Sequence, residues 1–162
     1  MKKIVTLLTV LVLLLSLTAC ASSPKEKVFT KNGMEITLTT EFTETSVDGY
    51  TVCYDSRRAA VFVLKESFTL MEGLEEMTVN EYAEIAREAN ANRAPSSVAT
   101  KDGITYFEYS FHNESENVTY RYYTTLHKGA DAFWMIQFAC PESTYATQQA
   151  TFSTWAQSIS VD

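Results

Sequence analysis

Cysteine and histidine are the side chains best suited to bind a transition metal or to act as a nucleophile and its base, and this sequence has few of them. It contains three cysteines (Cys20, Cys53 and Cys140) and two histidines (His112 and His127). No pair has the Cys-x-x-Cys or His-x-x-x-His spacing of a metal site. The sequence also lacks a glycine-rich phosphate loop and the Gly-x-Ser-x-Gly elbow of the hydrolases. It therefore predicts neither a metal site nor a cofactor.

The two histidines fall at opposite ends of one predicted hairpin, formed by strands 104–112 and 117–127. With a turn centred near residue 115, His112 faces a residue near 118. His127 then lies about 25–30 Å further along, at ~3.3 Å per residue. The two rings cannot share a metal or a proton, so we expect two ordinary histidines on the surface or the rim of the sheet.

Cys20 stands directly after an export pattern. Lys2 and Lys3 precede an apolar stretch over residues 4–17, and Leu17-Thr18-Ala19-Cys20 follows. A positive start, a short apolar core and small residues at the cut are typical of a secretory signal. The apolar stretch is shorter than the ~20 residues that span a bilayer. The last four residues resemble the bacterial lipobox, whose signal is cut before the cysteine, between Ala19 and Cys20 here.

The lipobox implies that Cys20 carries the lipid and holds the protein at the outer surface of the bacterial membrane. An ordinary signal peptide with an incidental cysteine is the alternative. We expect a signal peptide over 1–19, a lipidated cysteine with a short tether over 20–27, and one globular domain over 28–162. Removing 19 of 162 residues leaves 143, and the loss of two lysines moves the formal charge from -7 to -9. Such an acidic domain is not expected to bind nucleic acid.

The other two cysteines and the acidic residues leave alternatives open. An exported protein can oxidise Cys53 and Cys140 to a disulfide, but isolated cysteines in strands also behave as small buried apolar groups. Glu72, Glu75 and Glu76 cluster around a glycine. Their spacing does not match a calcium-binding EF-hand loop, so we expect a solvated acidic loop.

Turn and cap residues divide the mature chain into strands and two helices. Asn32-Gly33, Asp48-Gly49 and Asp102-Gly103 favour two-residue hairpin turns, because both positions tolerate positive φ. Thr78-Val79-Asn80-Glu81 has capping-box spacing, and Pro141 fits the first turn of a second helix. The expected helices are 78–93 and one that starts at 141. The expected strands are 27–31, 34–40, 43–47, 50–55, 59–67, 97–101, 104–112, 117–127, 131–139 and 158–161.

These elements predict an α+β fold with a central antiparallel sheet of about six to eight strands. The run Ala59-Ala60-Val61-Phe62-Val63-Leu64 is apolar on both faces, so it belongs in the middle of the sheet. A sheet with two apolar faces needs a cover on each, and the two helices would supply it. A cystatin-like fold, with a helix on one face only, is the structural alternative.

A pattern of core positions extends over most of the mature chain. It comprises Asn32-Gly33-Met34-Glu35-Ile36-Thr37-Leu38, Phe42, Tyr82-Ala83, Phe107-Glu108-Tyr109, Trp134-Met135-Ile136-Gln137-Phe138 and Trp155-Ala156-Gln157-Ser158-Ile159. This pattern resembles the Mog1/PsbP-like family, which includes small bacterial lipoproteins of the DcrB/PsbP type. The resemblance implies an α/β/α sandwich around an antiparallel sheet. Functions in the family diverge, from binding a small GTPase to assisting the oxygen-evolving photosystem, so the resemblance alone assigns no function.

Tyrosines are concentrated in the hairpin formed by 104–112 and 117–127. Core packing is the default for such residues, but alternation sends some of them to a face that no helix covers. Tyr106, Tyr120, Tyr122 and Tyr123 are therefore a candidate binding patch. We expect a non-enzymatic binding or accessory module at the membrane, with an unidentified protein or envelope partner. The alternative is an extracytoplasmic hydrolase with a carboxylate site.

Overall fold

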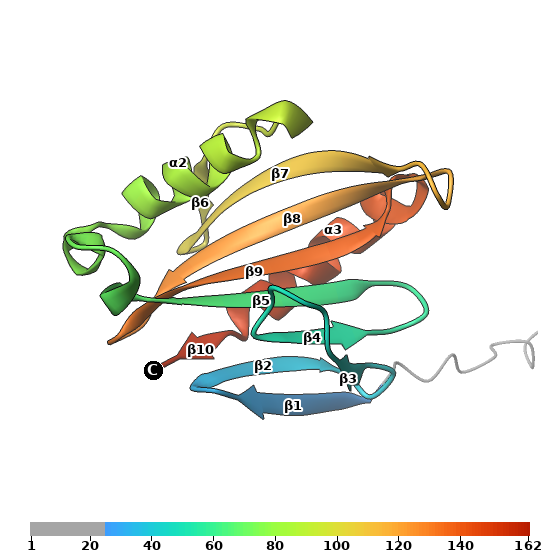
Figure 1. Ribbon diagram of the computed structural model, residues 1–162. Helices are drawn as coiled ribbons and strands as arrows, with labels where there is room; N and C mark the ends of the chain where they lie inside the picture. The colour runs from blue at the N-terminus through green and yellow to red at the C-terminus, as the bar shows by residue number, and fades with distance from the viewer. Residues whose placement is uncertain (1–24) are drawn as a thin grey trace, which may run out of the picture.

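The computed structural model describes residues 25–162. In this range the chain forms a seven-stranded antiparallel sheet, a three-stranded antiparallel sheet and two α-helices (Figure 1). The main sheet has the spatial order β3 (Thr43–Thr45), β4 (Val52–Asp55), β5 (Ala60–Ser67), β9 (Ala132–Pro141), β8 (Val118–Lys128), β7 (Ile104–Asn113) and β6 (Ala99–Lys101).

The small sheet and the helices complete the fold. The small sheet has the order β1 (Glu26–Lys31), β2 (Met34–Thr39) and β10 (Ser160–Val161). The helices are α2 (Val79–Ala89) and α3 (Glu142–Gln157). Three short 3-10 turns are η2 (Phe68–Leu70), η3 (Leu74–Glu76) and η4 (Ala91–Arg93).

Two predicted tight turns set the register of their hairpins. Asn32 and Gly33 join β1 to β2 with φ values of 53° and 91°, and Asp102 and Gly103 join β6 to β7 with 52° and 81°. Two successive residues at positive φ define the turn that matches the twist of a hairpin. The third predicted site differs, because only Gly49 has positive φ there and the β3–β4 connection is a longer loop.

The larger core lies between the main sheet and a layer formed by α3 and the small sheet. Val61 and Val63 of β5 pack there with alternate residues of β9, and the second layer contributes residues such as Ile36 and Phe152. β9 supplies Trp134, Ile136, Phe138 and Cys140 to this core. The N-terminal strands therefore form a separate sheet within this layer, rather than extending the main one.

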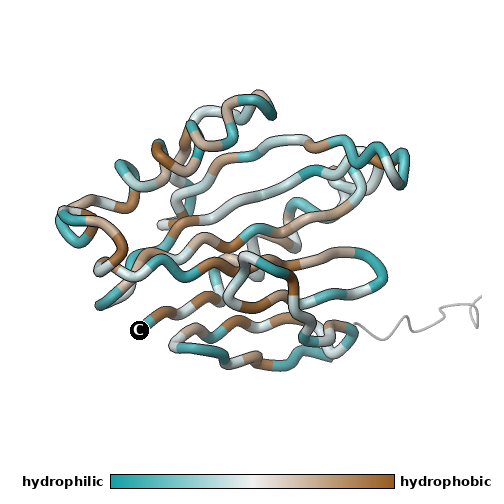
Figure 2. Tube along the Cα trace, in the orientation of Figure 1, coloured by the Kyte–Doolittle hydropathy of each residue, from teal (hydrophilic) through white to brown (hydrophobic). Residues whose placement is uncertain are grey.

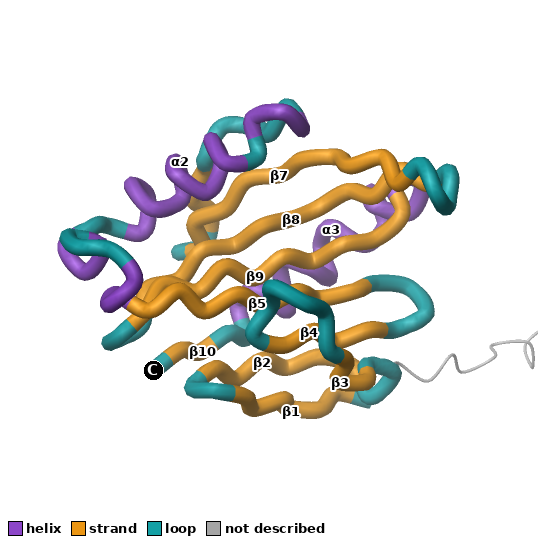
Figure 3. The backbone as a smooth tube through the Cα atoms, viewed as in Figure 1, coloured by secondary structure: helices purple, strands orange, loops and turns teal. Residues whose placement is uncertain are grey.

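The second core lies beneath α2 on the opposite face of the sheet. Phe107 of β7 and Phe133 of β9 are buried there with Tyr82 of α2, whose ring stacks on Phe133 at 4.2 Å between centroids. Helical layers thus lie on both faces of one antiparallel sheet, as the sequence predicted (Figure 3).

The first strand begins earlier than the sequence indicated. Glu26 pairs with Thr39 and Lys27 pairs with Leu38, so both residues belong to β1 instead of to a tether that reaches residue 27. The ammonium of Lys27 lies 4.4 Å from the centroid of the Phe29 ring, which gives this charged residue a contact within the strand. The predicted signal peptide, Ala19 and Cys20 lie outside the described residues.

The capping box of α2 is present as predicted, and its removal gives a first testable expectation. The Thr78 hydroxyl accepts from the Glu81 backbone N–H at 3.2 Å, and the Glu81 carboxylate accepts from the Thr78 N–H at 2.8 Å. Thr78→Ala is expected to lower the free energy of unfolding by about 1 kcal/mol in urea titrations. Thr154→Ala, the same change inside α3, is the control and should change it by less than ~0.5 kcal/mol. Equal losses would contradict a capping role.

Candidate ligand-binding site

The α2 side of the main sheet is covered over only part of its width. α2 packs against β7 and β8, and no helix of the described chain lies over β4 and the neighbouring half of β5 (Figure 1). We call this uncovered area the open face. It is formed by the α2-side residues Asp55, Ala60, Phe62, Tyr120, Tyr122 and Ala139.

A hollow lies on the open face where two alanines stand side by side. Ala60 of β5 pairs with Ala139 of β9; Ala60 also pairs with Asp55, and Ala139 with Tyr122. Residues in register share a face of the sheet, so this row places two methyl groups between a carboxylate and a tyrosine ring. The resulting cavity has a volume of about 360 Å³. That volume suits a small organic ligand.

Aromatic rings form the walls of the hollow. The ring of Tyr122 stacks on Tyr109 of β7, with 4.7 Å between centroids and 8° between planes. Tyr109 covers the β7 side of that ring, so the other side is directed over Ala139 toward Phe62, whose centroid is 6.4 Å away. Tyr120 lies two residues earlier on the same face and completes the wall. The hollow therefore has aromatic sides above a floor of methyl groups.

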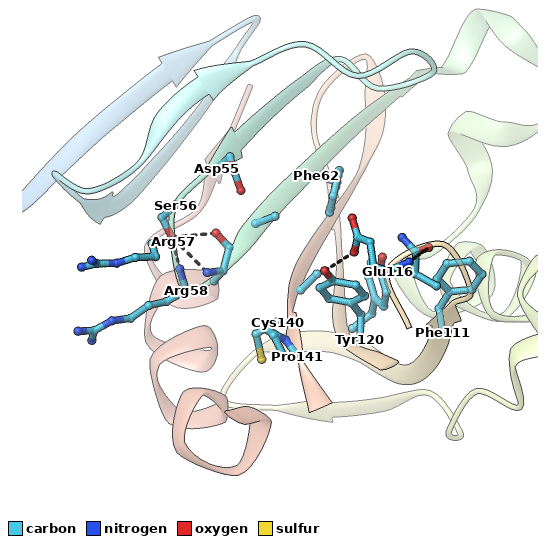
Figure 4. A pocket seen from close by; sticks show the side chains of 15 residues that line it. Asp55, Ser56, Arg57, Arg58, Phe62, Phe111, Glu116, Tyr120, Cys140 and Pro141 are labelled. Atoms are coloured by element: carbon cyan, nitrogen blue, oxygen red, sulfur yellow. Dashed lines mark hydrogen bonds between the residues drawn. The ribbon is translucent and has the colours of Figure 1, made fainter. Parts of the chain in front are cut away.

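Two carboxylates flank this aromatic hollow. Glu116 accepts a hydrogen bond from the Tyr120 hydroxyl at 2.6 Å, which holds it beside the rings, and Asp55 lies across the floor (Figure 4). Neither forms an ion pair with any described residue. Arg57 and Arg58 also line the cavity, but their side chains extend away from the rings (Figure 4) toward the first turns of α3. Negative charge thus predominates beside the aromatic part.

Two hydrophilic turns border the outer end of the hollow. The β4–β5 turn contains Ser56, Arg57 and Arg58, and the β7–β8 turn contains Glu114 and Glu116. Both turns are hydrophilic and lie at the same end of the sheet (Figure 2). The hollow therefore opens at a polar end of the molecule, where solutes have access to it.

A chain of hydrogen bonds fixes the inner end of the open face. The buried amide of Gln137 accepts from the Tyr50 hydroxyl at 3.2 Å and donates to the Tyr109 hydroxyl at 2.9 Å. Arg93, which follows α2, donates to the same Tyr109 oxygen at 3.4 Å and lies over the rings of Tyr109 and Phe111. This chain connects the β3–β4 loop, two strands and η4, so it orients the rings behind the hollow.

The tyrosines of the open face and the neighbouring Tyr109 remain protonated at neutral pH. Burial raises the pKa of Tyr109 to about 12 and also raises that of Tyr122. The hydrogen bond to Glu116 is the main reason why the pKa of Tyr120 is raised. Their hydroxyls therefore act as neutral hydrogen-bond donors and not as bases.

Gln137→Leu is expected to lower the free energy of unfolding by about 1–3 kcal/mol, because the Tyr50 and Tyr109 hydroxyls would lose their amide partner. Chemical denaturation measures this loss. Gln157→Leu is the control, since Gln157 is exposed at the end of α3 and its side chain makes no hydrogen bond within residues 25–162. A Gln137 variant as stable as the control would show that the chain does not support the fold.

The four tyrosines proposed from the sequence do not form one surface. Tyr120 and Tyr122 line the hollow, as described above. Tyr123 is buried beneath α3, and Tyr106 packs beside it at 4.8 Å between ring centroids. Strand alternation puts these two on the face that α3 covers, so they contribute to the core and not to a binding patch.

The histidines are far apart in the hairpin, as predicted, and they differ in burial. His112 is exposed and contacts the Thr119 hydroxyl at 3.0 Å. His127 is partly buried at the other end of β8, where loss of contact with water lowers its pKa to about 4. His127 thus lies at the rim of the sheet, as expected, but its ring faces the α3 side in register with Trp134 and is largely removed from water.

Cys53 and Cys140 are both buried and free in the described structure. Cys53 pairs with Phe62 and so points to the α2 side, whereas Cys140 belongs to the core on the α3 side. Opposite faces of one sheet exclude a disulfide between them, which settles the alternative that the sequence left open. Burial raises the pKa of both thiols, so both are poor nucleophiles at neutral pH.

The acidic residues Glu72, Glu75 and Glu76 lie in and beside η3. Glu72, Glu75 and Glu76 are exposed, and the backbone carbonyl of Glu75 accepts from Lys128 at 2.6 Å. Within residues 25–162, no three histidine, cysteine, aspartate or glutamate side chains are arranged to hold a metal ion. None of the helices described there is long and apolar enough to cross a membrane.

The fold, but not the sequence, is similar to known proteins. No family model matches the sequence, and no curated protein sequence matches it. The solution structure of cyanobacterial PsbP (CyanoP) from Synechocystis sp. PCC 6803 matches with a TM-score of 0.56 and 12% identity, over 90% of this chain and 99% of that one.

Two further solved structures are similar. One, from Bacteroides thetaiotaomicron, has a TM-score of 0.52 and 10% identity over 86% of this chain, which spans about half of that protein (48%). The other is LpqN, involved in cell envelope biogenesis of Mycobacterium tuberculosis, with a TM-score of 0.41 and 10% identity over 89% of this chain and 87% of that one. The match to CyanoP confirms the α+β, PsbP-like fold predicted from the sequence.

Proposed function

We propose that this chain is an extracytoplasmic lipoprotein that acts as a non-enzymatic binding module, with its ligand site in the hollow of the open face. The observation that carries the proposal is the hollow itself, a cavity of about 360 Å³ with aromatic walls on a face that α2 leaves uncovered. Concave sites with aromatic sides and a few polar groups at the rim are the usual form of small-ligand sites.

The absence of a nucleophile and base pair at the hollow supports binding without catalysis. No histidine of the described chain lines it, and its tyrosines are protonated at neutral pH. The carboxylates of Asp55 and Glu116 lie on either side of an apolar floor of two alanines. This arrangement favours holding a ligand over activating a water molecule.

The proposed anchor would place the hollow close to a membrane. Glu26 and Arg58 line one shared groove, so the start of β1 lies at the same end of the molecule as the turns that border the hollow (Figure 1). Five residues lie between Cys20 and Glu26, so six residue-to-residue steps join them. At about 3.4 Å per residue this segment reaches about 20 Å. A protein lipidated at Cys20 would therefore hold the hollow near the membrane surface.

The anchor is tested by replacing its cysteine. Cys20→Ala in the full-length chain is expected to abolish labelling by radioactive palmitate and to move the protein from the detergent phase to the aqueous phase. Cys53→Ala is the matched control and should keep both properties, because Cys53 is buried in the domain. If the Cys20→Ala protein still enters the detergent phase, the anchor is not at Cys20.

The binding surface is tested by crosslinking in intact cells. A benzophenone-bearing phenylalanine analogue at position 62 places the reactive group beside the hollow, and the same analogue at position 154 places it on the exposed side of α3. We expect adducts of defined mass from position 62 only. The same adducts from both positions, or adducts from position 154 alone, would contradict binding at the open face.

A further inference from the structure

We infer that the hollow binds a small soluble molecule that carries a quaternary ammonium group, an inference that rests on the proposed binding function. Three features together point to this chemistry: the aromatic walls, the two flanking carboxylates and the apolar floor.

The aromatic walls favour a cation. Phe62, Tyr120 and Tyr122 line the hollow from two sides, and the face of a benzene-type ring is negative. A cation within about 6 Å of such a face gains ~0.5–2 kcal/mol. The neighbouring rings of Tyr109 and Phe111 already contact Arg93, at 5.3 Å and 5.1 Å from its guanidinium carbon to the centroids. Phe111 also lines the hollow, but the rings of Phe62, Tyr120 and Tyr122 make no such contact within the described chain.

The carboxylates supply complementary charge. Asp55 and Glu116 lie at opposite sides of the floor and form no ion pair with a described residue, whereas Arg57 and Arg58 extend away toward α3 (Figure 4). A cation bound beside the rings would therefore lie between two negative charges, while the arginines of the β4–β5 turn at the entrance are directed away from it. These carboxylates are exposed, so their effect is expected to weaken as ionic strength rises.

The floor distinguishes a quaternary from a primary ammonium group. Ala60 and Ala139 present methyl groups and no hydrogen-bond acceptor. A primary ammonium placed there would lose water from the N–H groups that face these methyl groups, and only N–H groups directed to the flanking carboxylates would regain an acceptor, which is unfavourable. A quaternary ammonium has no N–H to satisfy, and its methyl groups can pack against the alanines and the rings.

The same carboxylates argue for a free solute rather than a lipid headgroup. A phosphate attached close to the ammonium group would lie beside Asp55 or Glu116 and be repelled by it. The arginines near α3 are directed away from this position (Figure 4). We therefore expect choline itself to bind more tightly than glycerophosphocholine.

The first experiment measures affinities by calorimetry on the full-length chain in micelles of an uncharged detergent. The probes are choline, its uncharged isostere 3,3-dimethyl-1-butanol, the primary amine ethanolamine, and glycerophosphocholine. We expect choline to bind at least about tenfold more tightly than each of the others, since 1.4 kcal/mol corresponds to a factor of ten. Equal or tighter binding of any of the three would overturn the inference.

Variants then locate the site. Ala139→Leu fills the hollow and is expected to lower choline affinity at least tenfold. Ala86→Leu is the matched control, because Ala86 lines a different groove between α2 and β5 and should leave the affinity unchanged. The surface substitutions Asp55→Asn and Glu116→Gln together are expected to weaken binding several-fold and to remove most of its salt dependence. Full affinity in Ala139→Leu, or in the double variant, would overturn the inference.

The outcomes separate this inference from the proposed function. If the uncharged isostere binds as tightly as choline and Ala139→Leu abolishes both, the hollow is a ligand site and only the choice of a cation is wrong. If none of the probes binds, the ammonium inference is overturned, and the crosslinking at position 62 still decides whether the open face binds another ligand.

Discussion

Phe138→Ala is expected to lower the free energy of unfolding by about 3–5 kcal/mol, because it removes a fully buried ring and leaves a cavity between the two layers. Phe138 has no exposed surface. Its ring centroid lies 5.6 Å from that of Phe152 and 6.2 Å from that of Trp155, both in α3, and 6.3 Å from that of Tyr123 in β8. Its ring therefore contributes directly to the packing of β9 against α3.

Equilibrium urea unfolding monitored by circular dichroism measures this loss. Phe111→Ala is the matched control, since the Phe111 side chain is 39% exposed at the end of β7. Phe111→Ala is expected to lower the free energy of unfolding by roughly 1 kcal/mol or less. Similar losses in the two variants would contradict the assignment of the main core to the α3 side of the sheet.

The second large effect is a loss of stability in mild acid caused by His127. Burial lowers the pKa of this ring to about 4 in the folded protein, whereas an unfolded histidine titrates near 6.5. Between these values the unfolded chain binds a proton that the folded chain does not, so stability falls as the pH falls. Over the range from pH 7 to pH 4 the loss from this one group is expected to be about 3 kcal/mol.

The contribution of His127 is isolated by comparing variants at the same pH. Unfolding free energies at pH 7 and pH 4.5 are measured for the wild type, His127→Gln and His112→Gln. The His127 variant is expected to lose less stability on acidification than the wild type, and the exposed His112 variant to behave like the wild type. Carboxylates titrate equally in all three proteins, so their effect cancels. Equal pH dependence of the wild type and the His127 variant would contradict a buried neutral imidazole.

Local sequence signals predicted most of the fold because each depends on residues close together in the chain. Asn32-Gly33 and Asp102-Gly103 form the expected turns, and Thr78 with Glu81 forms the expected capping box. The split into two sheets was not predictable in this way. It depends on β10 pairing with β2, more than 120 residues away in the sequence, and on β9 occupying the place beside β5.

The candidate site was only partly predictable. Tyr120 and Tyr122 were singled out because they are large and lie in a strand, and strand alternation separates them from Tyr123. The floor could not be found from the sequence. Ala60 and Ala139 are 79 residues apart in the chain, and only the register between β5 and β9 places them side by side. The sequence indicates only that Gln137 lies in an apolar strand. Its hydrogen bond with Tyr50 depends on the β3–β4 loop, which is distant in the chain.

Alanine methyl groups allow the most direct test that the hollow of the open face is the ligand site. In a ¹³C-methyl-alanine NMR spectrum of the full-length chain in micelles, Ala60 and Ala139 report on the hollow. Ala150 reports on the groove beside α3, and Ala86 and Ala89 report on the groove beside α2. Addition of choline is expected to shift the Ala60 and Ala139 methyl signals and to leave the other three in place. Shifts confined to Ala150, Ala86 or Ala89, or no shift at Ala60 and Ala139, would contradict the assignment of the ligand site.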